Sequence, residues 1–353
     1  MTQIRIDLYS DTHSKPTAAM RAAMASAEVG DEQQEADPTT NLLQEMVADL
    51  LGKEAALFLP SGTMCNQIAF RVWCEPGDEI IIDTTGHAIH SEMGGAAALS
   101  GASFRVIDGE RGVFSPEQLR AVVRAPSIYA PRSALLSVEN TVNFAGGRVW
   151  PLAALTAVCQ AAKDCGLKRH MDGARLMNAV VESGVSAAAY GAQVDSCWID
   201  LSKGLGCPVG GVLAGERDFI RAALRFKHQF GGAMRQSGII AAAGIHALAH
   251  HVERLAEDHA NARRLAAAVS GIPGLRLDPP EIETNMVYLD LAETGWTARA
   301  LSEALKAEGL LISVMGETRL RAVTHLDVTA EMIDEAAGLL AKLLAQAPRA
   351  VAE

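Results

Sequence analysis

Short apolar segments alternate with helical patterns through the first two-thirds of the chain. Helical patterns cover residues 16–26, 39–51, 64–72, 152–162 and 176–182. Strand candidates lie at residues 55–59, 79–83, 103–107, 133–138, 167–171, 194–201 and 211–214. This alternation predicts an α/β fold, in which a mostly parallel sheet lies between helices on both of its faces.

The pattern changes towards the C-terminus. Residues 236–269 predict a long alanine-rich helix or a pair of helices, and the glycine- and proline-containing segment 271–274 ends it. Strand candidates at 284–291, 310–314 and 320–323 then alternate with helical patterns at 297–308 and 330–344. We therefore expect a large domain over residues 1–245 and a small α+β domain over residues 246–353, with a frayed tail after Ala347.

Composition argues against several classes of partner. The chain has 353 residues, a mean hydropathy of +0.12 and no run of 18 or more uncharged apolar residues, so we expect no membrane-spanning helix. The net charge is −11 and no basic stripe is present, which argues against a nucleic-acid partner. The N-terminal residues lack the apolar core of a signal peptide. The six cysteines form no Cys-x-x-Cys pair, so we expect reduced thiols in a cytoplasmic protein.

A carboxylate and an amine follow two of the strand candidates. Asp172 lies in Arg-His-Met-Asp-Gly-Ala-Arg and Lys203 lies in Asp-Leu-Ser-Lys-Gly-Leu-Gly, so each opens into a glycine-containing turn. An enzyme that uses pyridoxal phosphate (PLP) needs this pair. The lysine forms an imine with the cofactor, and the aspartate keeps the pyridine nitrogen protonated so that the ring can take up electrons. The alternative is an ordinary surface lysine, but the apolar and glycine neighbours of Lys203 favour burial.

Other segments have more than one interpretation. Pro-Ser-Gly-Thr at 60–63 joins a strand candidate to a helix, which predicts either a helix N-cap or an anion site made by backbone amides. His87 and His90 are too few for a metal site, and no acidic or thiol partner has helical spacing around them, so a ring stacked on a flat cofactor or a loop histidine fits better. Arg175 and Arg321 lie near strand ends, where each is either a carboxylate clamp or a surface residue.

Taken together, these segments resemble the threonine aldolase family of fold-type-I PLP-dependent enzymes over nearly the whole chain. The matching stretches are Ser10-Asp11-Thr12, Val29-Gly30-Asp31, Asp37-Pro38-Thr39-Thr40-Asn41, Pro60-Ser61-Gly62-Thr63-Met64, His87 with Glu92-Met93-Gly94-Gly95, Glu139-Asn140-Thr141, His170-Met171-Asp172-Gly173-Ala174-Arg175, Leu201-Ser202-Lys203-Gly204-Leu205-Gly206, Met234-Arg235-Gln236 and Arg321-Ala322-Val323-Thr324-His325-Leu326-Asp327. Their order along the chain makes the resemblance specific. It implies a fold-type-I large domain with a small C-terminal α+β domain.

The resemblance also implies residue roles. Lys203 would bind PLP covalently, Asp172 would pair with the pyridinium nitrogen, and His87 would stack on the ring and contribute to proton transfer. The other residues implied at the cofactor are Gly62, Thr63, Arg175, Ser202 and, from a neighbouring subunit, Arg235. Those implied at the substrate are Ser10, Arg175, Arg321, Gln34 and Tyr129. No metal is expected.

The implied reaction is retro-aldol cleavage of a β-hydroxy-α-amino acid, of the L-threonine or L-allo-threonine type, to glycine and an aldehyde. The resemblance also implies a homotetramer with active sites at subunit interfaces, so a dimer is the minimum expected. The alternatives are β-elimination or amino transfer by another fold-type-I enzyme, or a PLP-fold scaffold that has lost catalysis. The intact Lys203 and Asp172 argue against the last.

Several positions depart from the family pattern. Gln34 replaces a tyrosine expected near the neighbouring active site, Tyr129 stands where many members have a second active-site histidine, and Val142 replaces a histidine after Glu-Asn-Thr. Near the N-terminus, Tyr9 and His13-Ser14 replace the more usual Arg and Val-Thr. The imine chemistry is untouched. Our hypothesis is that the changes give a different substrate side chain or an altered threo/erythro preference.

Overall fold

The computed structural model describes residues 3–346 and divides the chain into two compact units. One unit is Pro16–Val252, and the other combines Met1–Lys15 with Glu253–Glu353. The N-terminal residues cluster with the C-terminal ones because β1 (Ile6–Leu8) pairs in parallel with β11 (Leu310–Val314). The expected domain boundary at residues 245 and 246 falls inside a helix of the larger unit, and the division into domains at that point stays a prediction. The fraying expected after Ala347 lies outside the described residues.

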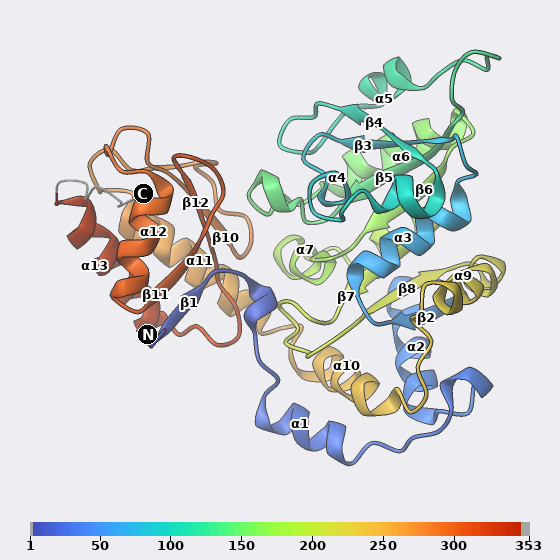
Figure 1. Ribbon diagram of the computed structural model, residues 1–353, viewed down its shortest axis with the longest axis horizontal. Coiled ribbons are helices and arrows are strands. Elements are labelled where there is room, and N and C mark those ends of the chain that lie inside the picture. The colour runs from blue at the N-terminus through green and yellow to red at the C-terminus, as the bar shows by residue number, and fades with distance from the viewer. Residues whose placement is uncertain (1–2, 347–353) are drawn as a thin grey trace. The chain divides into compact units, whose positions relative to one another are not determined.

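The larger unit is built on a sheet whose described strands have the order β2-β8-β7-β6-β5-β3-β4 (Figure 1). Neighbours from β4 to β7 run parallel, whereas β8 is antiparallel to both β7 and β2. The prediction of an α/β fold with a mostly parallel sheet is confirmed. The strands are β2 (Ala55–Leu59), β3 (Glu79–Asp83), β4 (Ser103–Ile107), β5 (Ser133–Glu139), β6 (Lys168–Asp172), β7 (Ser196–Asp200) and β8 (Gly211–Gly215).

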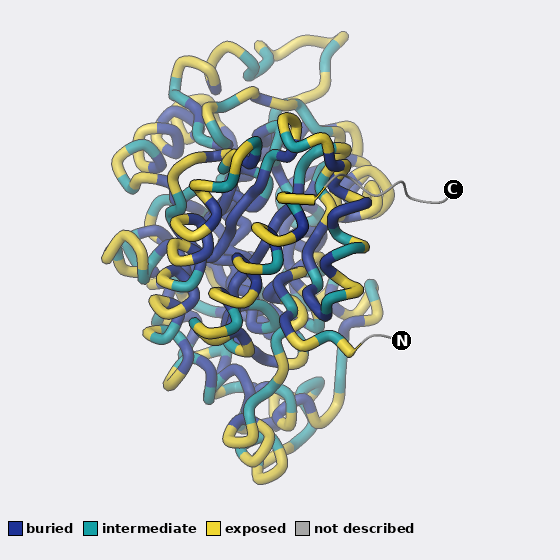
Figure 2. Tube along the Cα trace, turned by 90° about the vertical axis from the view of Figure 1, so that its left-hand side faces the viewer, coloured by how far each residue is buried: buried dark blue, intermediate teal, exposed yellow. Residues whose placement is uncertain are grey.

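Helices cover both faces of this sheet. Every residue of β3, β7 and β8 is buried, which a strand achieves only when both faces are packed. Figure 2 draws buried residues in dark blue. On one face, Leu57, Trp198 and Leu213 pack with α3 and α9 in a hydrophobic core. The helices of the unit are α1 (Ala18–Ala25), α2 (Pro38–Leu51), α3 (Gly62–Trp73), α4 (His87–His90), α5 (Pro116–Val122), α6 (Leu152–Asp164), α7 (Leu176–Ser183), α8 (Ala187–Gly191), α9 (Arg217–Gln229) and α10 (Gly238–His250).

The smaller unit has its own core and its own sheet. The sheet order is β1-β11-β12-β10-β9, with β9 (Arg276–Leu277), β10 (Met286–Asp290) and β12 (Arg319–Val323). Apolar residues of these strands pack with those of α11 (Leu255–Val269), α12 (Ala298–Ala307) and α13 (Ala330–Leu344). The predicted α+β composition of the C-terminal residues is confirmed. The alanine-rich stretch is a helix pair, because α10 ends at His250 and α11 begins at Leu255.

Two expectations from composition can be compared with the structure. All six cysteines are unpaired, and all but Cys165 are buried. Within residues 3–346, no helix has both the length and the apolar character needed to cross a membrane.

Candidate active site

Three neighbouring parallel strands, β5, β6 and β7, end in charged residues at the same edge of the sheet, where the carboxyl ends of the strands lie. Glu139 is the last residue of β5 and Asp172 the last of β6, and the two are paired in register. β7 ends at Asp200, and Lys203 follows in the next turn. The carboxyl ends of parallel strands are where α/β folds bind ligands, so the edge predicted from Asp172 and Lys203 is a candidate active site.

The Asp172 carboxylate is buried and held in one orientation. Its Oδ1 accepts the Ala174 amide at 3.0 Å, and its Oδ2 accepts the Asn66 side-chain amide at 2.7 Å. Gly173 permits this turn, because a Cβ there would lie 1.9 Å from the Trp198 carbonyl oxygen. A fixed carboxylate at a strand end is what the charge of a pyridinium nitrogen requires.

Asn66 connects most of the polar groups around Asp172. Its Nδ2 also donates to Glu92 Oε1 at 2.7 Å, and its Oδ1 accepts the Trp198 indole N–H at 2.7 Å. His170 Nε2 lies 3.1 Å from the same oxygen. Burial lowers the pKa of His170 to about 4, so this imidazole is neutral at neutral pH.

His87 lies at the start of α4 and faces the same carboxylates. Its Nδ1 is 3.0 Å from Glu92 Oε1, and its backbone N–H donates to Glu139 at 2.8 Å. Burial by itself would lower the pKa of His87, but the Glu92 hydrogen bond and the charges of Asp172 and Glu139 raise it above its usual value. The side chain is 31% exposed, so a ligand can reach it.

Glu139 has the most perturbed carboxyl group at this edge. Burial, followed by the charge of Asp172, raises the pKa of Glu139 to about 7, although the amides of Asn143 and His87 donate to it. Strongly perturbed groups cluster at functional sites. The position of Glu139 beside Asp172 therefore supports the assignment of this edge as the active site.

Lys203 is held in a tight turn after β7. The Gly206 amide donates to its carbonyl oxygen at 2.8 Å, and the left-handed φ of +77° at Gly206 closes the turn. The Lys203 Nζ lies 2.9 Å from Asp200 Oδ2 and 5.7 Å from the centre of the Trp198 ring, and the side chain is 14% exposed. The interpretation as an ordinary surface lysine does not fit this setting.

The N-terminus of α3 lies beside this turn. Ser61 caps the helix by accepting the Met64 amide at 3.2 Å, so the N-cap interpretation is confirmed. A Cβ on Gly62 would lie 2.3 Å from the Trp198 ring and 3.0 Å from Asp200 Oδ2, so only glycine fits. Thr63 is exposed in the first turn. A helix N-terminus with exposed hydroxyls offers an anion such as a phosphate both donors and a favourable dipole.

Other predicted residues of the larger unit lie near these groups in the chain. Ser202 donates through its backbone N–H and its hydroxyl to Asp200 Oδ1, at 2.7 and 2.8 Å. Arg175 is buried and stands at the N-terminal end of α7, three residues beyond Asp172.

Ser10 and Arg321 both belong to the smaller unit, where Arg321 contacts Tyr9, the residue before Ser10. Ser10 is buried, and its hydroxyl accepts the Thr12 amide at 3.2 Å. Arg321 in β12 is 9% exposed and donates to the Tyr9 carbonyl oxygen at 3.5 Å. Their predicted task, binding a substrate carboxylate, stays a prediction.

The two segments predicted to serve a neighbouring subunit lie side by side. Arg235 Nη1 is 2.8 Å from Asp31 Oδ2, and its carbonyl oxygen accepts the Glu32 amide at 3.0 Å. The Arg235 side chain is 61% exposed, and Gln34 is exposed as well. Tyr129 is 92% exposed in the loop before β5, so it is not among the buried groups around Asp172.

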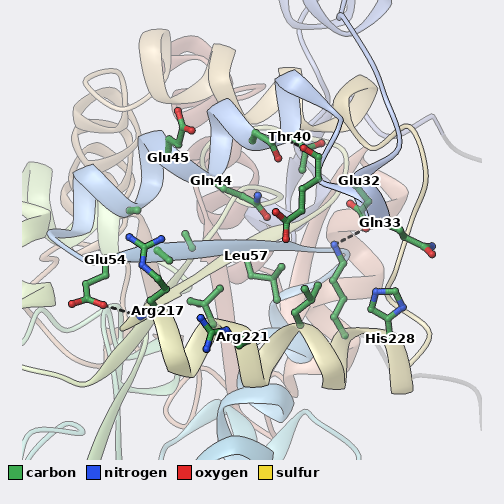
Figure 3. Close-up of a pocket in the computed structure, with 18 residues that line it drawn as sticks. Glu32, Gln33, Thr40, Gln44, Glu45, Glu54, Leu57, Arg217, Arg221 and His228 are labelled. Atoms are coloured by element: carbon green, nitrogen blue, oxygen red, sulfur yellow. Dashed lines mark hydrogen bonds and ion pairs between the residues drawn. The ribbon is translucent and has the colours of Figure 1, made fainter.

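A pocket of about 610 Å³ opens elsewhere in this unit, between α2, β2 and α9 (Figure 3). Its lining includes Glu32 and Lys227, whose buried ion pair spans 2.7 Å. Neither Lys203, Asp172 nor His87 lines it. This pocket therefore does not include the residues predicted to carry the chemistry.

Three residues that contact Asp172, His87 or Lys203 have no role in the sequence-based prediction: Asn66, Glu92 and Asp200. Asn66 was detectable as a polar residue on the buried face of α3, and Asp200 as a charge that ends a fully buried strand. Glu92 follows a helix of one turn, and nothing local in the sequence places it beside Asp172.

The histidines and carboxylates near Asp172 are also the candidate ligands for a metal ion. His90 Nε2 lies 2.7 Å from the Thr84 carbonyl oxygen, away from the Glu92 partner of His87, so the two histidines do not form a pair of ligands. His87, Glu92 and Asp172 each present a ligand atom within 4.8 Å of the others. Asn66 already donates to both carboxylates. The expectation that no metal binds stays a prediction.

The residues present fit PLP. A buried carboxylate fixed at the end of β6, a lysine with little exposure beyond β7 and a glycine-limited helix N-terminus match the ring nitrogen, the aldehyde and the phosphate of that cofactor. The fold and the site therefore define a fold-type-I PLP-dependent enzyme.

Comparison with known proteins supports this class of enzyme. Residues 7–292 match the model of the β-eliminating lyase family. The chain is 43% identical to the low specificity L-threonine aldolase of Escherichia coli K12, covering 94% of this chain and 97% of that protein. It is 41% identical to a probable low-specificity L-threonine aldolase of Arabidopsis thaliana, covering 92% and 93%. The solved structure of a Leishmania major threonine aldolase superposes with a TM-score of 0.82 at 18% identity, covering 96% and 99%, and supports the fold.

The chain belongs to the β-eliminating lyase family, with the threonine aldolases as its relatives. It is a PLP-dependent lyase, so the predictions of family, enzyme class and cofactor are confirmed.

Proposed function

We propose that this enzyme cleaves β-hydroxy-α-amino acids between Cα and Cβ, releasing glycine and an aldehyde. One observation carries the proposal: the ends of adjacent parallel strands present a fixed carboxylate, Asp172, and a partly buried amine, Lys203. L-threonine and L-allo-threonine are the reference substrates, because the curated relatives are named as low-specificity L-threonine aldolases.

PLP, when bound, supplies an electron-accepting ring that stabilises the electron pair left on Cα when the Cα–Cβ bond breaks. In our proposal, Lys203 is its covalent attachment point, and Asp172 holds a negative charge at the ring nitrogen throughout. The Asn66 amide and the Ala174 N–H fix that carboxylate, so little reorganisation is needed during the reaction. Gly62 and Thr63 bind the phosphate at the N-terminus of α3, with Ser202 and Arg175 completing the cofactor site.

His87 moves the proton of the β-hydroxyl group, either directly or through a water molecule that it orients. Glu92 accepts a hydrogen bond from one ring nitrogen of His87, so the other ring nitrogen is left to take up the hydroxyl proton. Because its pKa is raised, His87 is neutral and able to accept a proton only towards higher pH. Arg175 binds the substrate carboxylate through charge-assisted hydrogen bonds. The same task for Ser10 and Arg321 stays a prediction from the family resemblance.

We further propose a homo-oligomer, a tetramer with a dimer as the minimum, in the cytoplasm. Arg235 and Gln34 support the oligomer, because both are exposed on neighbouring segments where another chain can reach them. In this arrangement Arg235 binds the phosphate of a neighbouring subunit's cofactor.

A substrate panel tests the reaction. L-threonine, L-allo-threonine, phenylserine and 3-hydroxyaspartate are each assayed for both glycine and aldehyde. Equimolar glycine and aldehyde supports the proposal. Sustained formation of a keto acid with pyridoxamine phosphate would show amino transfer instead, and a keto acid with ammonia would show β-elimination.

The same panel tests substrate preference. Our hypothesis is that the departures at Gln34, Tyr129 and Val142 alter the accepted side chain or the threo/erythro preference. Val142 is buried and hydrogen-bonded through its backbone to Arg148, whereas the other two are exposed. If threonine has the highest kcat/KM by a wide margin, the hypothesis is wrong.

A further inference from the structure

Asp200 places a second carboxylate directly against the amine of Lys203. It ends β7, is 7% exposed, and its Oδ2 lies 2.9 Å from Lys203 Nζ. Its other oxygen accepts the backbone N–H and the hydroxyl of Ser202, at 2.7 and 2.8 Å. The carboxylate is thus fixed by the residue next to the lysine.

Asp200 also lies beside the first residue of α3. Its Oδ2 would lie 3.0 Å from a Cβ on Gly62. Family membership assigns no task to this group, and the proposed reaction does not use it.

We propose that Asp200 is the counter-ion of the Lys203 nitrogen. It is a positioning residue that keeps this nitrogen protonated, both as the ammonium group before PLP is bound and after the nitrogen has bonded to PLP. In the bonding step the Lys203 ammonium first gives up one proton, which leaves the nitrogen an electron pair to form the C=N bond with the cofactor aldehyde carbon. Two of its protons leave with the aldehyde oxygen as water. The third stays on nitrogen, so the positive charge is conserved and lies against Asp200. A protonated C=N group is the more reactive one towards an incoming substrate amine.

Three other titratable groups lie near Asp200 and Lys203, and two of them are uncharged thiols. Cys65 on α3 is buried between the charges of Asp200, Asp172, Glu92 and Lys203, and burial raises its pKa well above the usual value, so it stays a neutral thiol. Burial likewise keeps Cys207, in the turn after Lys203, neutral. His87 on α4 is also within the electrostatic reach of Lys203. Asp200 lies in direct contact with the nitrogen, so its removal should have a large effect.

The test is a spectral titration of the PLP-loaded enzyme. PLP bonded to a lysine changes its visible absorbance when the nitrogen loses its proton, and the pH midpoint of that change reports the nitrogen directly. Loss of an opposite charge within about 4 Å corresponds to roughly 1–3 pH units. We therefore expect the midpoint in Asp200→Asn to fall by at least about one pH unit. Asp200→Ser, which is smaller and also neutral, should show the same fall and serves if the asparagine variant does not fold.

Two controls separate charge from structure. Asp200→Glu keeps the charge and should leave the midpoint near that of the unchanged enzyme. Asp195→Asn makes the same substitution just before the other end of β7, where the carboxylate pairs with Arg169, and should leave the midpoint in place. An unchanged midpoint in folded, PLP-loaded Asp200→Asn or Asp200→Ser overturns the inference, and so does an equal fall in Asp200→Glu.

The inference rests on the proposed attachment of PLP to Lys203, which a separate variant tests. If Lys203→Ala keeps the pH-dependent visible band, that attachment is wrong. If Lys203→Ala loses the band but Asp200→Asn titrates like the unchanged enzyme, the attachment stands and only the role of Asp200 fails.

Discussion

The hydrogen bonds of the candidate active site give each of its carboxylates a distinct task. Asp172 is held by Asn66 and the Ala174 amide, Glu92 by Asn66 and Gln67, and Asp200 by Ser202. Similar side chains therefore serve different atoms of one site. The sequence motifs show which carboxylates are present, and the hydrogen bonds determine which one faces which group.

Asp172→Asn should abolish most of the activity. The amide keeps the shape of the side chain but removes the negative charge proposed to face the ring nitrogen. We expect kcat to fall by at least about 100-fold, the usual scale for losing one preorganised electrostatic group. The measurement is kcat for glycine formation at saturating PLP, with Asp195→Asn as the matched control. A loss below about tenfold would contradict the role of Asp172.

Glu92→Gln should change how the activity depends on pH. The hydrogen bond with Glu92 contributes to the raised pKa of His87, and a base must be unprotonated to act. We expect the acid limb of the kcat/KM profile to move to lower pH in this variant. At acidic pH, Glu92→Gln should then retain several-fold more of its own maximum than the unchanged enzyme. If the acid limb does not move, the group whose pKa it reports is not His87.

At the scale of elements, the βα alternation and the helix pair α10–α11 could be predicted because their apolar residues repeat with clear periods. The helix α9 was not predicted, since Arg217, Arg221, Arg225 and Lys227 make it read as a charged segment, although Phe219 and Ala223 pack in the core. The three-residue strand β1 is too short for a periodic signal.

Asp172 and Lys203 could be predicted from glycine-containing turns, whereas the positions of Asn66 and Glu92 depend on contacts between distant segments.

Gly62→Ala should disturb the start of α3. The added Cβ would lie 2.3 Å from the Trp198 ring, which is packed between β7 and the helix. Overpacking of this kind costs about 1–3 kcal/mol, and we also expect weaker PLP binding because the N-terminus of α3 has to shift. The measurements are urea unfolding and the Kd for PLP.

Gly338→Ala in α13 is the matched control for this substitution. Nothing lies within 4 Å of a Cβ at that position, so the alanine should stabilise the helix by up to about 1 kcal/mol. Unchanged PLP affinity and stability in Gly62→Ala would contradict the proposed phosphate site.

At the scale of the whole molecule, the free energy of unfolding should change with pH because of the protonation of His170. Burial lowers the pKa of His170 to about 4 from its usual 6.5, so between these values the unfolded chain binds a proton that the folded chain does not. The contribution of His170 to stability is therefore largest above pH 6.5 and falls as the pH decreases towards 4. The shift corresponds to a loss on the order of 3 kcal/mol from this one group.

Urea unfolding across this pH range checks that prediction. His170→Gln, which has no group that titrates there, should show a flatter dependence of the unfolding free energy on pH. His250→Gln, at an exposed histidine of α10, should follow the unchanged protein. Parallel curves for His170→Gln and the unchanged protein would contradict the buried, neutral assignment of His170.

The most direct test of the account is to locate the lysine that binds PLP. The PLP-loaded enzyme is reduced with sodium borohydride, digested, and analysed by mass spectrometry for the peptide that carries the cofactor. We predict a single adduct on Lys203, lost in Lys203→Ala together with glycine formation. An adduct on any other lysine, or full activity in Lys203→Ala, would contradict the assignment of the strand ends as the active site.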